Sequence, residues 1–360
     1  MQEKKIVEQK CRQCGGAMRF DPKKGKLVCD YCGTVIDVNS SAQDTQTELG
    51  GFDFNALNDQ ATVADAADLP VYNCESCGAE VIAPPEQAAL TCPYCANNIV
   101  LTDKVSGKLR PDGVIPFRLT AKELPDAMQR YYKNKALLPK NFFSESRMGR
   151  ITGVYVPFWV FSGRLSGTLD YRATRVSKHR SGDYEVTDTD HYRLTRDVSM
   201  SFEDMPVDAS AKIRNDLMDP LEPFDMSEVK PFDMSYLAGF TADRFDEAKS
   251  DIASRAENRM RTTAEAVADS QAGRGYSTAN RCGGSLRADI KAKYLLLPVY
   301  LFHISHGGKD YDFAVNGQTG KVVGTLPIDK GVSRTYFLVR MLGCAAAVAA
   351  ISLATYFMGR

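Results

Sequence analysis

The chain has 360 residues, enough for two or three domains, and its 45 Lys and Arg balance 45 Asp and Glu. This balance excludes a general electrostatic attraction to nucleic acid, so any such preference must come from a local patch. Residues 1–16 are polar and charged, so no secretory signal is expected ahead of the first domain.

Eight cysteines form two copies of one pattern, in which two C-x2-C pairs are separated by fourteen residues. They are Cys11, Cys14, Cys29 and Cys32 in the first copy, and Cys74, Cys77, Cys92 and Cys95 in the second. This spacing predicts two four-thiolate zinc ribbons. Four thiolates leave no open coordination position, so the two Zn²⁺ ions are expected to be structural. Disulfides are the alternative, but they need an oxidising compartment, whereas zinc thiolates need a reducing one.

Each ribbon has little apolar sequence of its own. Strands are expected at 17–20 and 26–28, and at 81–82 and 89–90 in the second copy. Neither unit has enough apolar residues for a core, so the metal is expected to supply about 10–16 kcal/mol of folding free energy. The predicted ranges are 1–38 for the first ribbon and 71–105 for the second.

Charge differs between the ribbons and the segment that joins them. Residues 1–38 carry eight Lys or Arg and five Asp or Glu, a net of +3, whereas 71–105 carry one Lys and four acids, a net of −3. Between them, 39–70 has six acids and no Lys or Arg, which is typical of a flexible acidic linker. Phe52, Phe54 and Leu57 interrupt it and could dock on a partner or on the body, or simply be loop residues.

Residues 106–330 are expected to form an α+β domain with an antiparallel sheet. The apolar run 154–161 predicts a buried strand, after which Gly163 and Gly167 suggest a turn. A similar phrase follows at 296–302, with a turn at Gly307–Gly308, so two hairpins in one sheet are expected. A third turn is expected at 315–320.

Helical spacing is present at 120–138 and again, over a longer stretch, from Ala242 to about Gln271, where Thr241 could cap the helix. The apolar stripe of the long helix is expected to pack on the core, with a partner site as the alternative. A local repeat, 223–227 and 231–235, predicts two turns that each pack a Phe on the body.

The last segment, 334–358, predicts a transmembrane helix. Residues 341–358 carry no charge, and the 22 positions from Tyr336 to Phe357 would reach about 33 Å against a hydrocarbon core of about 30 Å. A buried core helix is the alternative. More Lys and Arg precede the segment than follow it, so a single-pass cell-membrane protein with a cytoplasmic amino-terminal part is expected. Gly343 and Ala347 lie four apart, which either allows two such helices to pair or merely fills a weakly apolar span.

Catalytic patterns are not evident. Every Gly-Lys pair lacks the following Ser or Thr of a Walker A loop. Cys282 has no base beside it in sequence and is expected to be an ordinary, partly buried cysteine. His303 and His306 flank a turn and are expected to be solvated or hydrogen-bonded loop residues, with metal binding as the alternative. We therefore expect no enzymatic activity.

In five sequence segments, the chain resembles bacterial membrane proteins that carry TFIIB-type zinc ribbons. This family is often labelled primosomal replication-restart helicase-like. The segments are Cys11-Arg-Gln-Cys-Gly15, Cys29-Asp-Tyr-Cys-Gly33, Cys92-Pro-Tyr-Cys95, Tyr155-Val-Pro-Phe-Trp159 and Tyr311-Asp-Phe-Ala-Val-Asn-Gly-Gln-Thr-Gly-Lys321. The helicase label does not fit, because no Walker loop is present and the chain is too short for a two-lobed motor. The resemblance implies a scaffold that works with membrane-organising partners of the SPFH or phage-shock type.

The expected architecture is therefore multidomain, with two small four-cysteine zinc ribbons, an α+β body with a long helix, and a C-terminal transmembrane helix. The expected function is a membrane-anchored scaffold or adaptor that presents a cytoplasmic protein-interaction module. Because the second ribbon and the linker are acidic, we expect no nucleic-acid partner. A nucleic-acid binder tethered to the membrane is the alternative.

Overall fold

The structure is a computed structural model. It describes residues 11, 13–14, 16, 18–38, 52–53, 71–74, 76–82, 90–92, 94, 98–99, 111–133, 135–139, 142, 147–148, 151–243, 245, 247 and 249–358. The ribbon strands are β1 (Met18–Asp21), β2 (Lys26–Cys29), β3 (Val35–Ile36), β5 (Val71–Asn73), β6 (Glu80–Ile82), β7 (Leu90–Thr91) and β8 (Asn98–Ile99). Short body elements are β4 (Phe52–Asp53), β9 (Gly113–Val114), β10 (Arg147–Met148), β13 (Lys230–Pro231), β14 (Thr241–Asp243), α1 (Leu124–Tyr132) and α3 (Asn215–Met218).

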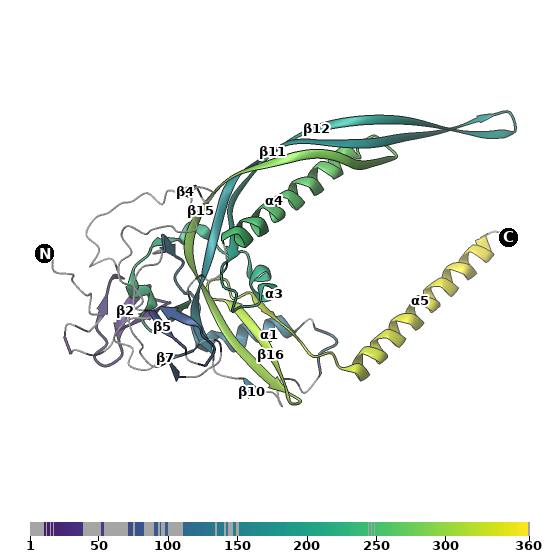
Figure 1. Cartoon of the computed structure of the whole chain (residues 1–360). Coiled ribbons are helices and arrows are strands. Elements are labelled where there is room, and N and C mark those ends of the chain that lie inside the picture. Colours follow the sequence, from purple (N-terminus) through teal and green to yellow (C-terminus); the bar gives the residue numbers. More distant parts are fainter. Residues whose placement is uncertain are drawn as a thin grey trace.

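Three very long strands dominate the molecule and form an arm that projects from the body (Figure 1). They are β11 (Thr152–Ser181), β12 (Tyr184–Asp208) and β15 (Thr278–His306). β11 lies between the other two and is antiparallel to both. At the base, β14 and β9 add parallel pairings, which makes a mixed sheet around an antiparallel centre.

The base of the sheet is buried on both faces, as the apolar run at 154–161 predicts. Tyr155, Trp159 and Phe161 belong to one core cluster, whereas Val154 and Phe158 belong to another. Successive side chains of a strand point to opposite faces, so this run supplies both cores at once. A strand buried on both sides has no polar alternation.

The expected turn at Gly163 and Gly167 is wrong, because β11 continues through both residues to Ser181. The glycines are close-approach positions instead. A Cβ on Gly163 would lie 2.1 Å from the carbonyl oxygen of Asp289 on β15, and one on Gly167 would lie 2.0 Å from that of Ser285. Only residues without a side chain let the strands approach this closely.

The long helix α4 (Lys249–Ala272) packs along one face of the arm (Figure 1). Its buried residues follow helical spacing and contact the arm and the body core; they are Ile252, Ala256, Met260, Ala264, Ala268 and Ala272. The core role of this stripe is thus confirmed. The predicted start is wrong, since Thr241–Asp243 is strand β14, paired with β11 and β6.

Of the other local predictions for the body, the turns and the short repeat are confirmed, whereas one helix is shorter than expected. β15 turns at Gly307–Gly308 into β16 (Lys309–Asn316), which turns again into β17 (Val322–Gly324). In the short repeat, Asp225 and Asp233 accept hydrogen bonds from the backbone of Ser227 and Ser235 and cap 3-10 helices η5 (Met226–Glu228) and η6 (Met234–Leu237). The helix predicted at 120–138 is shorter, with 3-10 helix η3 (Ala121–Glu123) leading into α1.

Helix α5 (Lys330–Met358) ends the described chain and stands apart from the body (Figure 1). Its span Lys330–Ala349 is long and apolar enough to cross a membrane, and none of it is buried in the protein. A core helix of a soluble protein would be buried, so the exposure favours the transmembrane alternative. The sheet body with its long helix, the two cysteine-rich units and the apolar C-terminal helix expected from the sequence are all present.

Candidate metal centres

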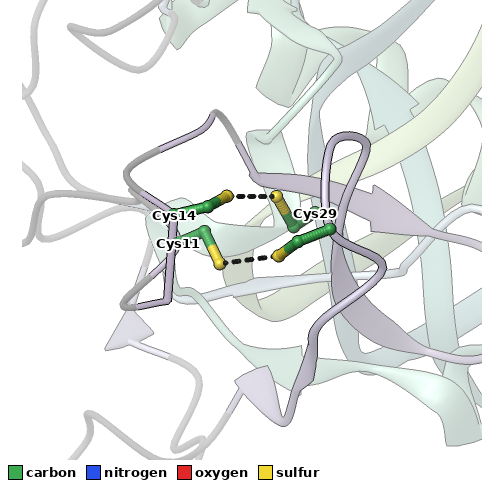
Figure 2. Close-up of side chains that lie close together, drawn as sticks. Cys11, Cys14 and Cys29 are labelled. Atoms are coloured by element: carbon green, nitrogen blue, oxygen red, sulfur yellow. Dashed lines mark hydrogen bonds between the residues drawn. The ribbon is translucent and has the colours of Figure 1, made fainter.

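The first cysteine quartet converges on one point. The Sγ atoms of Cys11, Cys14, Cys29 and Cys32 all lie within 4.8 Å of one another. Cys11 Sγ is 3.4 Å from Cys32 Sγ, and Cys14 Sγ is 3.5 Å from Cys29 Sγ (Figure 2). These separations exceed the roughly 2.05 Å of a disulfide and approach the roughly 3.8 Å of sulfurs placed about 2.3 Å from a tetrahedral Zn²⁺.

Two tight backbone turns hold this geometry. The amide of Cys11 donates to the carbonyl of Gly16 at 2.8 Å, and the amide of Cys29 donates to that of Thr34 at 2.9 Å. Gly33 donates back to Cys29 with a φ of 72°, a conformation that favours glycine. The turns therefore present both sulfurs of each pair to the same point. Gly15 lies outside the described residues.

Burial differs within the quartet. Cys11 and Cys29 are buried, whereas Cys14 and Cys32 are exposed. Cys32 Sγ lies 3.0 Å from the hydroxyl of Thr34, and this hydrogen bond lowers the pKa of the Cys32 thiol. A backbone hydrogen bond with Gly16 lowers the pKa of the Cys14 thiol, but contacts with the Cys32 and Cys29 sulfurs outweigh it and raise that pKa to about 12.

The second quartet is described for three of its four members. The Sγ atoms of Cys74, Cys77 and Cys92 lie within 4.8 Å of one another, and the Cys77–Cys92 separation is 3.5 Å. The same turn recurs, since Cys74 donates to Ala79 and Gly78, with φ of 72°, donates to Cys74. Cys95 lies outside the described residues. The two clusters can thus bind metal ions, and their all-sulfur donor sets fit a soft or borderline divalent ion.

The first ribbon is attached to the body by a shared core. Phe20, on β1, is buried and packs edge-on against Tyr236 at a ring separation of 5.4 Å. Its amide donates to the carbonyl of Ala238 at 3.0 Å. Lys23 forms an ion pair with Glu123 at 2.5 Å. Sequence reasoning missed this contact, because Phe20 fits equally well as part of the ribbon's own hairpin.

The second ribbon extends the body sheet. β6 pairs with β14, so that Ile82 lies opposite Ala242. Tyr94, between Cys92 and Cys95, packs against both the ribbon cluster and the body cluster. Burial and the nearby Asp243 carboxylate raise the pKa of the Tyr94 hydroxyl. The linker also touches the body, because β4 pairs Phe52 with Ala292 of β15; Phe54 and Leu57 lie outside the described residues.

The remaining sequence candidates are separate from these clusters. Gly343 and Ala347 are exposed on α5, and nothing lies within 4 Å of a Cβ placed on Gly343. Cys282 is exposed on the arm, rather than partly buried as expected. His303 is exposed, and the His306 ring lies 5.0 Å from that of Phe142. In the part of the chain that the structure describes, neither histidine joins a group of three potential metal ligands.

A buried ionic network links α4 to the sheet, and sequence reasoning did not find it. Asp208 is fully buried and accepts a 2.5 Å hydrogen bond from Arg255, which also pairs with Glu247 at 2.9 Å. Burial raises the pKa of Asp208 to about 6, although Arg255 opposes the shift. The partners are far apart in sequence, so no local pattern points to their pairing.

A groove of about 1030 Å³ lies along α1 and the segment that follows it. Its lining includes Arg130, Lys133 and Lys135, together with one acid, Asp126. The neighbouring segment is fixed to the chain leading into α5, because the amide of Asp329 donates to the carbonyl of Leu137 at 3.0 Å. Positive charge therefore gathers where the apolar helix begins.

Comparison with known proteins places the chain in a family. No family model and no solved structure matches it. One curated relative, the uncharacterized protein YdjG of Bacillus subtilis, is 34% identical over 335 residues, which cover 92% of this chain and 93% of the relative. The similarity therefore extends over nearly the whole of both proteins rather than over the cysteine motifs alone, and the chain belongs to the YdjG family.

Proposed function

We propose that this protein is a membrane-anchored, zinc-stabilised adaptor whose ribbons and β-body form a cytoplasmic platform for protein partners. The observation that carries the proposal is the combination, in one chain, of two cysteine clusters fused to a large sheet and an apolar helix whose span 330–349 is not buried by the described part of the protein. The metal ions are proposed to be structural, since four thiolates around one ion would leave no coordination position for a substrate.

Zinc is the metal proposed for both clusters. Matched C-x2-C pairs, sulfur separations near those of a tetrahedron and a reducing cytoplasm all favour Zn²⁺ over a disulfide pair. The metal would hold the knuckles of each ribbon. Because Phe20 and β6 attach those ribbons to the body, the metal would also stabilise the platform itself.

Helix α5 is proposed to anchor the platform in the cell membrane as a single span. Two features support a cytoplasmic body. Lys330 and Arg334 precede the apolar stretch, and Arg130, Lys133 and Lys135 line the groove along α1. An excess of Lys and Arg on one side of a span marks the cytoplasmic side.

The resemblance to TFIIB-type zinc-ribbon membrane proteins suggests membrane-organising or membrane-stress partners of the SPFH or phage-shock class. One observation favours the alternative of a membrane-tethered nucleic-acid binder. Tyr31, in the ribbon whose net charge is +3, is 82% exposed and could stack on a base. The −3 charge of the second ribbon and the acidic linker oppose it, so we favour a protein partner.

The test compares the full chain with two variants in cells. The first lacks 336–360, and the second carries Cys11→Ser and Cys77→Ser. We expect the truncated chain to leave the membrane fraction, and the cysteine variant to stay there but to lose capture of a co-expressed SPFH-type or phage-shock-type protein from detergent. A truncated chain that still sediments with membranes would refute the anchor. Capture of RNA or DNA at physiological salt, in place of the co-expressed protein, would favour the alternative.

A further inference from the structure

The far end of the arm is a two-stranded ribbon. Pairing between β11 and β15 ends at Thr174 and Thr278, and beyond it β11 pairs with β12 alone as far as Ser181 and Tyr184 (Figure 1). Helix α4 ends at Ala272, before this point in the fold. Within the described part of the chain, residues 177–181 and 184–190 thus have no third strand beside them.

This end of the arm is unusually open. All its side chains from Ser177 to Asp190 are exposed, except for the partly buried Val186. Tyr184 is 78% exposed, and Val176 is 41% exposed. A two-stranded ribbon is marginally stable in water by itself, and free strand edges tend to pair with another chain. A partner strand would complete this part of the sheet.

Charge separates completely between the two edges. Residues 177–181, on the β11 edge, contain Lys178, His179 and Arg180 and no acid. Residues 183–190, which lead into and form the β12 edge, contain four acids and no Lys or Arg. Two β11 edges or two β12 edges brought together would place like charges opposite each other, which is unfavourable. A β11 edge and a β12 edge are complementary.

We propose that this tip, residues 176–190, joins a second copy of the chain, with the basic β11 edge of one copy pairing with the acidic β12 edge of the next. Arms that lie side by side and point the same way place these edges antiparallel, so the two ribbons form one antiparallel sheet. The pairing is head-to-tail, which lets it continue to further copies. The right-handed twist of the joined sheet rotates successive arms and separates the bodies at their bases.

The ion pairs between β11 and β12 within one arm still leave both edges able to attract a second copy. Lys178 pairs with Glu185 at 2.9 Å, and His179 pairs with Asp188 at 3.2 Å. The side chains of both pairs are more than half exposed, so each pair contributes little to stability and can be shared with a neighbouring strand. Copies anchored in one membrane by α5 would already share the required orientation, but the inference does not depend on the anchor.

The test reverses the charges of both edges and exchanges the two partners of each internal ion pair, so that the pairs 178–185 and 179–188 keep opposite charges. The reversed variant carries Lys178→Glu, His179→Glu, Arg180→Glu, Asp183→Lys, Glu185→Lys, Asp188→Lys and Asp190→Lys, so that the β11 edge becomes acidic and the β12 edge becomes basic. It is made in a full chain that also carries Gly343→Leu and Ala347→Leu to remove pairing through the tail. Tagged and untagged copies are co-expressed, extracted in detergent and captured through the tag. The three combinations are native with native, reversed with reversed, and native with reversed, where native means that residues 176–190 are unchanged.

Each like combination is expected to co-purify, and the mixed combination is expected to fall to the background level of an unrelated membrane protein. Co-purification of reversed with reversed copies shows that the variant folds. Equal recovery in all three combinations would overturn the proposal, since the association would then lie elsewhere. Absence of co-purification from the native combination would overturn it as well.

Discussion

Replacing Phe20 by Ala tests whether the first ribbon is held to the body by its own core contact. Phe20 is 1% exposed, and its ring contacts Tyr236. Removing a buried Phe side chain costs about 3–5 kcal/mol. A closed zinc site contributes about 10–16 kcal/mol, so the loss is large enough to release the ribbon from the body but too small to release the metal. We expect an undocked ribbon that keeps its zinc.

Hydrogen exchange and metal analysis on the same sample separate these two effects. Amides of Phe20 and of 236–240 should exchange at least tenfold faster in Phe20→Ala, while the zinc content stays that of the wild type. Tyr31→Ala is the matched control, because Tyr31 is an aromatic residue of the same ribbon that is 82% exposed. The reasoning fails if Phe20→Ala loses one zinc per chain, or if exchange at 236–240 does not change.

Three further predictions concern other parts of the fold. Burial raises the pKa of Asp208 from 3.8 to about 6. The contribution of this carboxyl group to the free energy of unfolding is therefore fully present below about pH 4 and is lost as the pH rises through 6. In denaturant unfolding, the free energy of unfolding of Asp208→Asn should gain roughly 3 kcal/mol on that of the wild type between pH 4 and 7, and a difference that does not change with pH would contradict this. Cys77→Ser should speed amide exchange at Ala242 as well as in the second ribbon, because β6 pairs with β14; exchange confined to 71–99 would show that the ribbon is uncoupled. Gly343→Leu with Ala347→Leu should keep the chain in the membrane but lower tail pairing in a membrane two-hybrid assay with 330–360 alone, and unchanged pairing would rule out that role for the small residues.

The sequence predicts most local features of the candidate site. The spacing of the cysteines is sufficient to predict the clusters, because two C-x2-C turns at this separation have few arrangements other than around one metal ion. The described Sγ atoms do converge in both clusters. Strand positions in the first ribbon also agree within one residue. The buried run at 154–161 and the turn at Gly307–Gly308 were predictable because each depends on a few adjacent residues.

The long-range features were not predictable in the same way. Gly163 and Gly167 suggest a turn unless the neighbouring strand is known to pass within 2.1 Å of the Cβ positions. Thr241 is a good helix cap by type, yet its segment pairs with two strands from distant parts of the chain. The pairing of Asp208 with Arg255 likewise depends on how α4 lies on the sheet. The ranges 1–38, 39–70, 71–105 and 106–330 stay predictions, since the ribbons share strands and core with the body.

Metal analysis of the purified full chain tests the central claim most directly. The protein is extracted in mild detergent without added metal or chelator, and zinc and iron are measured against protein concentration by mass spectrometry. Our account predicts two zinc ions per chain, one in Cys11, Cys14, Cys29 and Cys32, and one in Cys74, Cys77, Cys92 and Cys95, with Cys11→Ser and Cys77→Ser each removing one. A single zinc per wild-type chain, iron in place of zinc, or cysteines recovered as disulfides would contradict it.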